Sequence, residues 1–368
     1  METQKRKLPA TETPGNGSGQ RKGQRRYLRL FRLRLIWLFA LTALVAVSCL
    51  KIQNAKRNYE ALQILEDEPC VAYKMSQPTW LSRILPAFAK DAFGGLLFQD
   101  VAQIKNYQLE GCDSNVFFRA TGQFSSLKSF ECSFGDLRKR HFVEIAKNEE
   151  LETLVLHGVT IASGSFQQIS EFPRLQYLEV WGLGEMEGVF TASRFPRLDT
   201  LALEGIALSE ETFAQISQLE LCSLRIVDSE LAQGSLKALG SMSSIEEMSL
   251  ASIQITDEDC AQLAKLQQLR ELDLAGSNVS DRGVEILCRS LTGLRSLDLK
   301  YCEHISDASA DSLLQLTNLE EVTLARTSLS SAAITKLGLS LNLKKLHISS
   351  SQNSPELGGL VPAISLYD

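Results

Sequence analysis

Residues 294–307 read LRSLDLKYCEHISD, and residues 269–274, one unit earlier, read LRELDL. Their shared pattern, L-x-x-L-x-L, recurs along most of the chain. Its first positions are Leu127, Leu151, Leu175, Leu198, Leu221, Ile245, Leu269, Leu294, Leu319 and Leu343. The steps between them are 23–25 residues, and we place an eleventh copy at Ile104, where the pattern is weaker. A fixed period of this length is typical of stacked structural repeats.

The second half of each unit predicts a capped helix. A branched apolar residue, then a Ser or Thr, then often an acid follow the strand pattern, as in Val279-Ser280-Asp281. The hydroxyl is suited to cap the free amides at a helix start, and the acid suits the positive end of the helix dipole. Each unit is therefore expected to run strand, turn, helix and return.

Stacking such units predicts a solenoid, because one unit alone cannot bury its leucines. The strands form a parallel sheet on the concave side, and the helices line the convex side. Nine strand spacings give an inner arc of about 43 Å. Leucines at pattern positions 1, 4 and 6 point into the core, so positions 3, 5 and 7 project from the concave face.

The repeats resemble the leucine-rich repeat family over roughly residues 100–350. Residues 294–307 resemble its cysteine-containing subtype, with Cys302 where a Cys or Asn bonds the turn backbone. Other units have Ser229, Ser277 or Thr327 there, which weakens the functional associations of that subtype. The whole layout is similar to bacterial single-pass membrane-anchored leucine-rich repeat proteins. The resemblance implies an α/β leucine-rich repeat solenoid preceded by one transmembrane helix, and it implies no defined activity.

Charge divides the chain into a basic tail and an acidic body. Residues 1–34 hold ten Lys or Arg and two Glu, a net +8. Since the whole chain carries −6, the remainder carries −14. An acidic body disfavours nucleic acid as a partner, because phosphate contacts need clustered Lys and Arg. The composition, 44% apolar and 22% charged, excludes global disorder.

An uncharged stretch, LIWLFALTALVAVSCL at 35–50, predicts a membrane anchor. With snorkelling basic flanks, residues 35–52 suffice for one signal-anchor helix. The positive charge before it places the N-terminus in the cytoplasm and the repeats across the membrane. A cleaved signal peptide, lipidation at Cys49 and a buried helix of a soluble domain remain alternatives. The domains expected are a disordered tail (1–34), the anchor (35–52), a juxtamembrane segment and N-terminal cap (53–100), repeats (101–350) and a C-terminal cap (351–368).

The cap assignments follow from apolar residues at both ends of the array, because terminal repeats leave an apolar face uncovered. An amphipathic helix over 78–97 is the N-terminal candidate, with Trp80 and Phe88 on its apolar face. Cysteines allow a bridge between Cys260 and Cys288 if the domain is exported, although buried free thiols are the simpler interpretation.

No motif for a nucleophilic, nucleotide-binding or zinc-dependent enzyme occurs, so we expect neither an enzyme nor a cofactor or metal site. The candidate partner-binding residues project from the concave face. They are Val155, His157, Tyr177, Glu179, Trp181, Glu204, Arg225, Glu247, Glu271, Asp273, Asp298 and Glu321. Exposed Trp, Tyr and Arg are enriched at binding hot spots, and the last five form an acidic stripe. The alternatives are that Trp181 fills a gap in an irregular unit and that the stripe is an ordinary solvated surface.

These observations favour a non-enzymatic, membrane-anchored scaffold that binds a protein or peptide through its concave face. The alternative is the substrate-recognition component of a ubiquitin-ligase-like complex of the F-box type, which similar cysteine-containing repeats serve. That function requires an adaptor-binding helix set, and residues 60–100 show none.

Overall fold

The structure is a computed structural model. It describes residues 39, 42–43, 45–46, 49–50, 53–66, 71–75, 101–106, 114–124, 126–162, 164–165, 171–184, 186, 188–232, 234–357 and 361–367. The chain divides into two units, Met1–Lys56 and Arg57–Asp368. The predicted tail at 1–34 and the predicted cap helix at 78–97 lie outside the described residues.

The first unit is described only in part. Its described residues are helical, including Phe39 and residues 53–56, and Thr42 donates a hydrogen bond to the Phe39 carbonyl. Within the described part of the chain, no helix has both the length and the apolar character needed to cross a membrane. Much of the predicted anchor at 35–52 falls outside that part.

The second unit is an α/β repeat array built on one 13-stranded sheet, in which the strands follow chain order. β1 pairs antiparallel with β2, and every later pair is parallel. The strands are β1 (Val71–Met75), β2 (Val101–Asn106), β3 (Ser129–Leu137), β4 (Thr153–Ile161), β5 (Tyr177–Gly184), β6 (Thr200–Glu204), β7 (Ser223–Val227), β8 (Glu247–Ser249), β9 (Glu271–Asp273), β10 (Ser296–Asp298), β11 (Glu321–Thr323), β12 (Lys345–Ser349) and β13 (Ala363–Tyr367).

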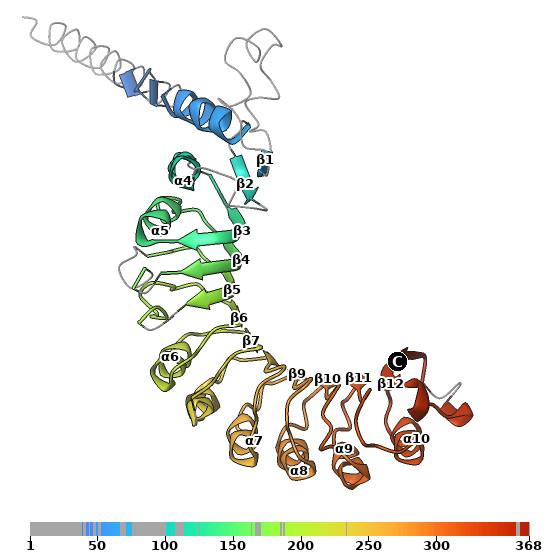
Figure 1. Cartoon of the computed structure of the whole chain (residues 1–368). Helices are drawn as coiled ribbons and strands as arrows, with labels where there is room; N and C mark the ends of the chain where they lie inside the picture. The colour runs from blue at the N-terminus through green and yellow to red at the C-terminus, as the bar shows by residue number, and fades with distance from the viewer. Residues whose placement is uncertain are drawn as a thin grey trace, which may run out of the picture. The chain divides into compact units, whose positions relative to one another are not determined.

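Helices cover one side of this sheet. They are α4 (Ser114–Thr121), α5 (Lys139–Ile145), α6 (Glu210–Ile216), α7 (Asp257–Leu263), α8 (Asp281–Ser290), α9 (Ala310–Leu313) and α10 (Ser331–Ser340), with 3-10 turns η3 (Ser235–Ser241), η4 (Asp307–Ser309), η5 (Ser350–Gln352) and η6 (Pro355–Leu357). Within this unit, strands β3 to β12 line the inner side of the curve, and helices α5 to α10 line the outer side (Figure 1).

The leucine pattern positions the strands in all ten predicted copies. Each strand from β3 to β12 begins two residues after the first position of its copy, as β9 does after Leu269. Leu269, Leu272 and Leu274 are all buried, as expected of positions 1, 4 and 6. The weaker copy placed at Ile104 is wrong in register by three residues. Gln103 pairs with Ser129, so Val101 takes the first position and Ile104 the fourth, and both are buried.

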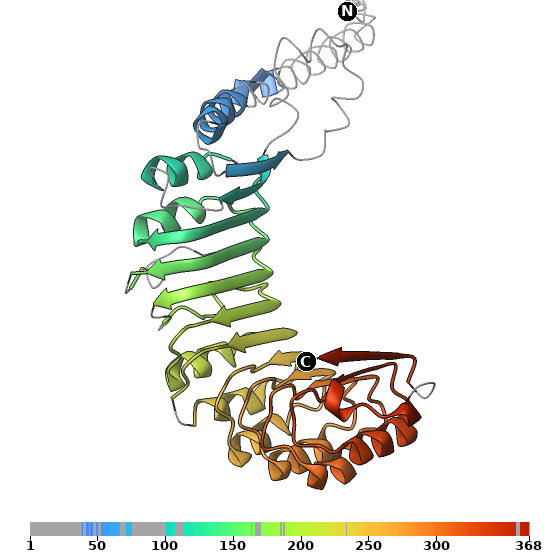
Figure 2. The same ribbon diagram turned by 45° about the vertical axis from the view of Figure 1, so that its right-hand side comes forward.

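The strands shorten along the array. β3 and β4 have nine residues each and β5 has eight, whereas β8 to β11 have three each. The longer strands are the green arrows in Figure 2. The extra length follows Phe134 and Gly158, which both adopt left-handed φ; pairing of β3 with β4 resumes in the same register at Gly135 and Val159, whereas Gly158 forms a bulge relative to β5. The repeat period alone does not predict this difference.

The predicted helix caps are present. The side chains of Ser209, Thr256, Ser280 and Ser330 each accept a hydrogen bond from a backbone N–H in the first turn of the next helix. The acid that opens a helix also reaches the following repeat. Ser280 Oγ donates to Asp257, and comparable bonds connect later repeats, so the acids link neighbouring repeats as well as facing a helix dipole.

The cysteines of the array that the structure describes are free thiols. Cys260 and Cys288 lie on the successive helices α7 and α8 and are both buried and unpaired. Cys260 Sγ faces the backbone of Gly283, five residues before Cys288 on α8, which explains why the two do not pair. Cys302 donates from Sγ to the Leu274 carbonyl at 3.1 Å, so this thiol bonds the turn backbone as expected.

Short elements lie at both ends of the sheet. Ala61 and Leu65 of the helix over 57–66 belong to the continuous core, next to β2 residues. At the other end, Leu357 in η6 and Val361 are buried against Gly338 of α10, and β13 adds the last strand. The core is thus covered at its C-terminal end by residues within the segment expected to form a cap.

Candidate functional site

The strand register brings seven of the predicted residues onto adjacent strands of the concave face. His157, Trp181 and Glu204 lie opposite one another on β4, β5 and β6. One row away, Val155 lies opposite Glu179. Tyr177 and Arg225 complete this group, which we call the aromatic cluster: Val155, His157, Tyr177, Glu179, Trp181, Glu204 and Arg225.

Hydrogen bonds fix the polar members of the aromatic cluster. His157 Nε2 lies 3.0 Å from Glu179 Oε1, and the Tyr177 hydroxyl donates to Glu179 Oε2. Burial tends to raise the pKa of Glu179, but the bonds from Tyr177 and His157 outweigh it and hold that pKa below its ordinary value. Burial and the bond to Glu179 raise the pKa of Tyr177 to about 12. The carboxylate therefore stays ionised and orients both neighbours.

Trp181 is exposed although its neighbours are held in place. The side chain is 44% exposed, and its ring packs edge-on to His157 with centroids 5.9 Å apart. Gly205, in the turn after β6, lies beside the indole, where a Cβ would come within 3.9 Å of Trp181 Cδ1. Trp181 therefore does not simply fill a gap in an irregular unit. Val155 differs from expectation, being only 9% exposed, because Glu131 and Glu179 flank it in register.

Two apolar residues beside the aromatic cluster were not predicted. Leu183, two residues beyond Trp181 on β5, is 70% exposed, and Phe134 on β3 is 49% exposed. The Phe134 ring lies over Gly158, where any Cβ would approach it to 2.7 Å. Leu183 continues the alternation of β5 beyond position 7, and Phe134 has the left-handed φ that interrupts β3, so counting positions 3, 5 and 7 misses both. Gly158 is the one signal in the sequence for this irregularity, because a glycine within a strand often marks a bulge or a close contact.

Four of the five acids in the predicted stripe line a shallow hollow of about 210 Å³. They are Glu247, Glu271, Asp273 and Asp298, with Arg225 of the aromatic cluster at the same hollow. The fifth, Glu321, is paired instead with Lys345 at 2.7 Å and with His347 at 3.2 Å. The hollow therefore joins the two predicted groups into one surface.

The four carboxylates of the hollow have different roles. Asp273 accepts from Ser249 Oγ and from the Ala275 N–H, and Asp298 accepts from the Lys300 N–H, so both stabilise turns. Burial, with the charge of Asp273 nearby, raises the pKa of Asp298. Glu247 and Glu271 are exposed, and within the described residues neither carboxylate is seen in a hydrogen bond or ion pair. These two acids are the ones available to a partner.

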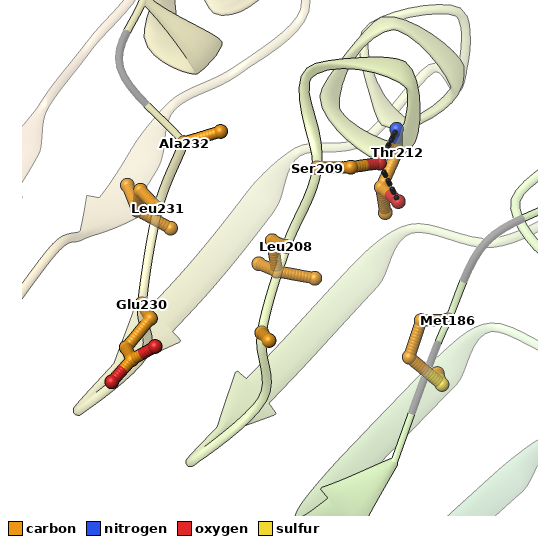
Figure 3. Close-up of a pocket in the computed structure, with 8 residues that line it drawn as sticks. Met186, Leu208, Ser209, Thr212, Glu230, Leu231 and Ala232 are labelled. Atoms are coloured by element: carbon orange, nitrogen blue, oxygen red, sulfur yellow. Dashed lines mark hydrogen bonds between the residues drawn. The ribbon is translucent and has the colours of Figure 1, made fainter.

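A second hollow lies on the flank of the array, away from the predicted residues. It has a volume of about 440 Å³ and lies among three successive turns (Figure 3). Met186 comes from the first turn, Leu208 and Ser209 from the second, and Glu230 to Ala232 from the third. Ser209 is already used as the cap of α6, accepting from the Thr212 N–H. Most of the residues that line this hollow are apolar, and their side chains do not form a cluster of catalytic or metal-binding groups.

The described residues show no cluster of three or more His, Cys, Asp or Glu side chains suited to a metal ion. Within that same part of the chain, the His157 ring hydrogen-bonds to Glu179, whose other carboxylate oxygen accepts from the Tyr177 hydroxyl. Comparison with known proteins finds no family model that matches the chain. A search of curated proteins finds no matching relative.

Proposed function

We propose that this chain is a non-enzymatic leucine-rich repeat protein that binds a protein or peptide partner through the concave face of its array. Two features support the repeat assignment. The 23–25-residue period carries one strand per unit at a constant offset, and Cys302 bonds the turn backbone in the unit that most resembles the family.

One observation carries the binding proposal: the Trp181 side chain is 44% exposed, while the polar residues beside it are held in place by hydrogen bonds to Glu179. An exposed indole gains binding energy when a partner removes it from water, and tryptophan is enriched among the residues that dominate interfaces. The hydrogen bonds of Glu179 hold His157 and Tyr177 before a partner arrives. Preorganisation of this kind lowers the entropy cost of binding.

The charge of the neighbouring hollow supports a basic partner. Glu247 and Glu271 present free carboxylates, and Asp273 and Asp298 line the same hollow. Arg225 also lines this hollow, and its guanidinium forms an ion pair with Glu204 at 3.7 Å. We therefore propose a ligand segment with an apolar side chain for Trp181 and Lys or Arg side chains for the hollow, three to five strands away.

The proposal includes anchoring by residues 35–52, with the N-terminus in the cytoplasm and the repeats outside it. Its support is the uncharged apolar stretch and the ten basic residues before it. Protease digestion of intact cells tests this part. Loss of the repeat body to external protease is expected, and protection of that body in intact cells but not in lysed cells would contradict the orientation.

Peptide selection tests the binding proposal. The full chain in detergent is used to select from a displayed library of random peptides, and the selected peptides are titrated against Trp181→Ala, Glu271→Lys and the control Glu220→Lys. Glu220 is exposed in the loop before β7, so the control has the same charge change away from the concave face. We expect selected peptides to be basic and to bind the control normally.

Trp181→Ala is expected to weaken binding at least roughly 30-fold, since hot-spot truncations cost about 2 kcal/mol or more. Glu271→Lys should weaken basic peptides most at low salt, because the interaction is electrostatic. Peptides that bind both variants as well as they bind the control would contradict a concave-face site. Selection of neutral or acidic peptides that need Trp181 would keep the site and reject the proposed charge of the partner.

A further inference from the structure

The last strand of the sheet has one paired edge and one open edge. β13 pairs with β12 in parallel register, and the Ala363 N–H donates to the Lys344 carbonyl at 3.2 Å. Successive residues of a strand direct their backbone groups to opposite edges. The N–H and C=O groups of Ile364 and Leu366 therefore face outward, where no described strand pairs with them.

Within the strand itself, β13 lacks the charges and prolines that usually protect an open edge, although Pro362 directly precedes it. Its sequence, AISLY, contains neither a charged residue nor a proline. Leu366 is in register with the buried Ile348 yet is 50% exposed, so an apolar side chain lies exposed on the core side of the last described strand. By contrast, the edge strand at the other end, β1, carries the exposed Lys74.

We propose that β13 pairs antiparallel with β13 of a second copy of this chain. Because outward backbone groups come from Ile364 and Leu366, each Ile364 lies opposite Leu366 of the other copy, and the twofold axis passes through Ser365. This register makes four backbone hydrogen bonds and places like faces of the two sheets together. Ile364 and Leu366 then form two apolar cross-strand pairs on the core side, and the uncharged strands bring no repulsion.

Other geometry fits this arrangement. On the concave face, the Tyr367 ring is already held by Lys300, whose Nζ lies 4.1 Å from the ring centroid, so Tyr367 leaves the edge free. Five paired residues bury far less than the about 1,200 Å² of a typical stable interface, so we expect a reversible dimer. The inference stands apart from the concave-face site, because β13 contributes no residue to it.

A symmetric disulfide tests the register. Ser365 meets its own counterpart as a non-hydrogen-bonded pair, for which the Cα separation is about 4.5 Å, within the range that a disulfide spans. Full-length Ser365→Cys in detergent should therefore give a covalent dimer under mild oxidation. The matched control is Ser241→Cys, exposed at the end of η3, and wild type reports dimers formed by native thiols such as Cys49.

Sedimentation velocity on the chain without added cysteines tests the edge itself. Wild type should show a dimer fraction that rises with concentration, and Leu366→Pro should be monomeric at the same concentrations. Proline there removes an outward N–H and no bond to β12, so the fold is retained, which circular dichroism checks. A Leu366→Lys variant, which keeps the N–H but adds like charges, should also lose dimer.

Three results overturn the proposal: a monomer at all concentrations, equal cross-linking of Ser365→Cys and Ser241→Cys, or a dimer unaffected by Leu366→Pro. Open-ended oligomers would instead assign the β13 edge to β1 of the next copy, which also rejects the symmetric pair. Peptide binding by the concave face is expected to be unchanged in Leu366→Pro, so the two proposals fail separately.

Discussion

Replacing Asp281 with alanine removes three hydrogen bonds that join one repeat to the next. Its carboxylate accepts from the Ser306 N–H at 2.8 Å, from the Ser306 hydroxyl at 2.6 Å and from the Ser309 hydroxyl. Two other helix-opening acids make fewer such bonds. Asp307 accepts two, both from Ser330, and Asp257 accepts one, from Ser280.

The magnitude follows from this count. A hydrogen bond to a charged group contributes about 1.5–3 kcal/mol to stability, but Asp281 is only partly buried, so water replaces much of what is lost. We expect Asp281→Ala to lower the free energy of unfolding by about 2–3 kcal/mol and Asp257→Ala by about 1 kcal/mol. Asp307→Ala should fall between them. All three acids occupy the first helical position, so their interaction with the helix dipole is a shared background.

Urea unfolding of the full chain, followed by circular dichroism, measures the series, and an unchanged dependence on urea shows that the same transition is compared. Hydrogen exchange at η4 and α9 localises the loss for Asp281→Ala. Equal losses for the three variants would show that the helix dipole alone explains these acids. A larger loss for Asp257→Ala than for Asp281→Ala would refute the bond count altogether.

Three further outcomes follow. Ser306 and Ser309 hold the pKa of Asp281 low against the effect of burial, so its stabilisation is present above the unfolded pKa of about 3.9 and disappears as pH falls through the folded value. The difference in unfolding free energy between wild type and Asp281→Ala should therefore shrink as pH falls below about 3.9 and vanish below the folded pKa. Gly158→Ala should lower thermal stability by about 1–2 kcal/mol through its left-handed φ of 59°, and adding Phe134→Ala should restore only the steric part. Cys302→Ala should cost about 1 kcal/mol by removing the thiol bond to the Leu274 carbonyl, which keeps its bond from the Ser277 N–H, whereas Cys302→Ser, measured by the same urea titration, should cost less.

The leucine spacing predicted the strands well because it reports burial directly. The leucines of the pattern, such as Leu272, are buried in the core. Their regular spacing therefore predicts where each strand from β3 to β12 begins. Ile104 was misplaced because β2 lies 26 residues before the first strong copy, outside the 23–25-residue period, and Val101 is less distinctive than leucine. The helix caps by Ser and Thr were equally predictable from the sequence, because each cap bonds a backbone N–H only three residues further along the chain.

The candidate site was predictable in outline only. Alternation along a strand places Glu179 and Trp181 on the concave face, but it does not show that Glu179 bonds His157 from another repeat. Nor does it separate Asp273, which stabilises a turn, from Glu271, which remains free two residues earlier on the same strand. These distinctions depend on contacts about 24 residues apart in the chain, and a bulge such as that at Gly158 alters them without changing the composition.

The gradient in strand length gives the array a mechanical polarity. Every strand pairs only with its neighbours in the chain, so a force applied at one end peels the sheet one strand at a time. Peeling from the C-terminal side first meets β13 and β12, of five residues each, and then the three-residue strands β11 to β8, where each step breaks few backbone bonds. It then reaches β5, β4 and β3, where each step breaks the bonds of eight or nine residues. The segment that holds Trp181 is therefore the part of the array that resists such a force longest.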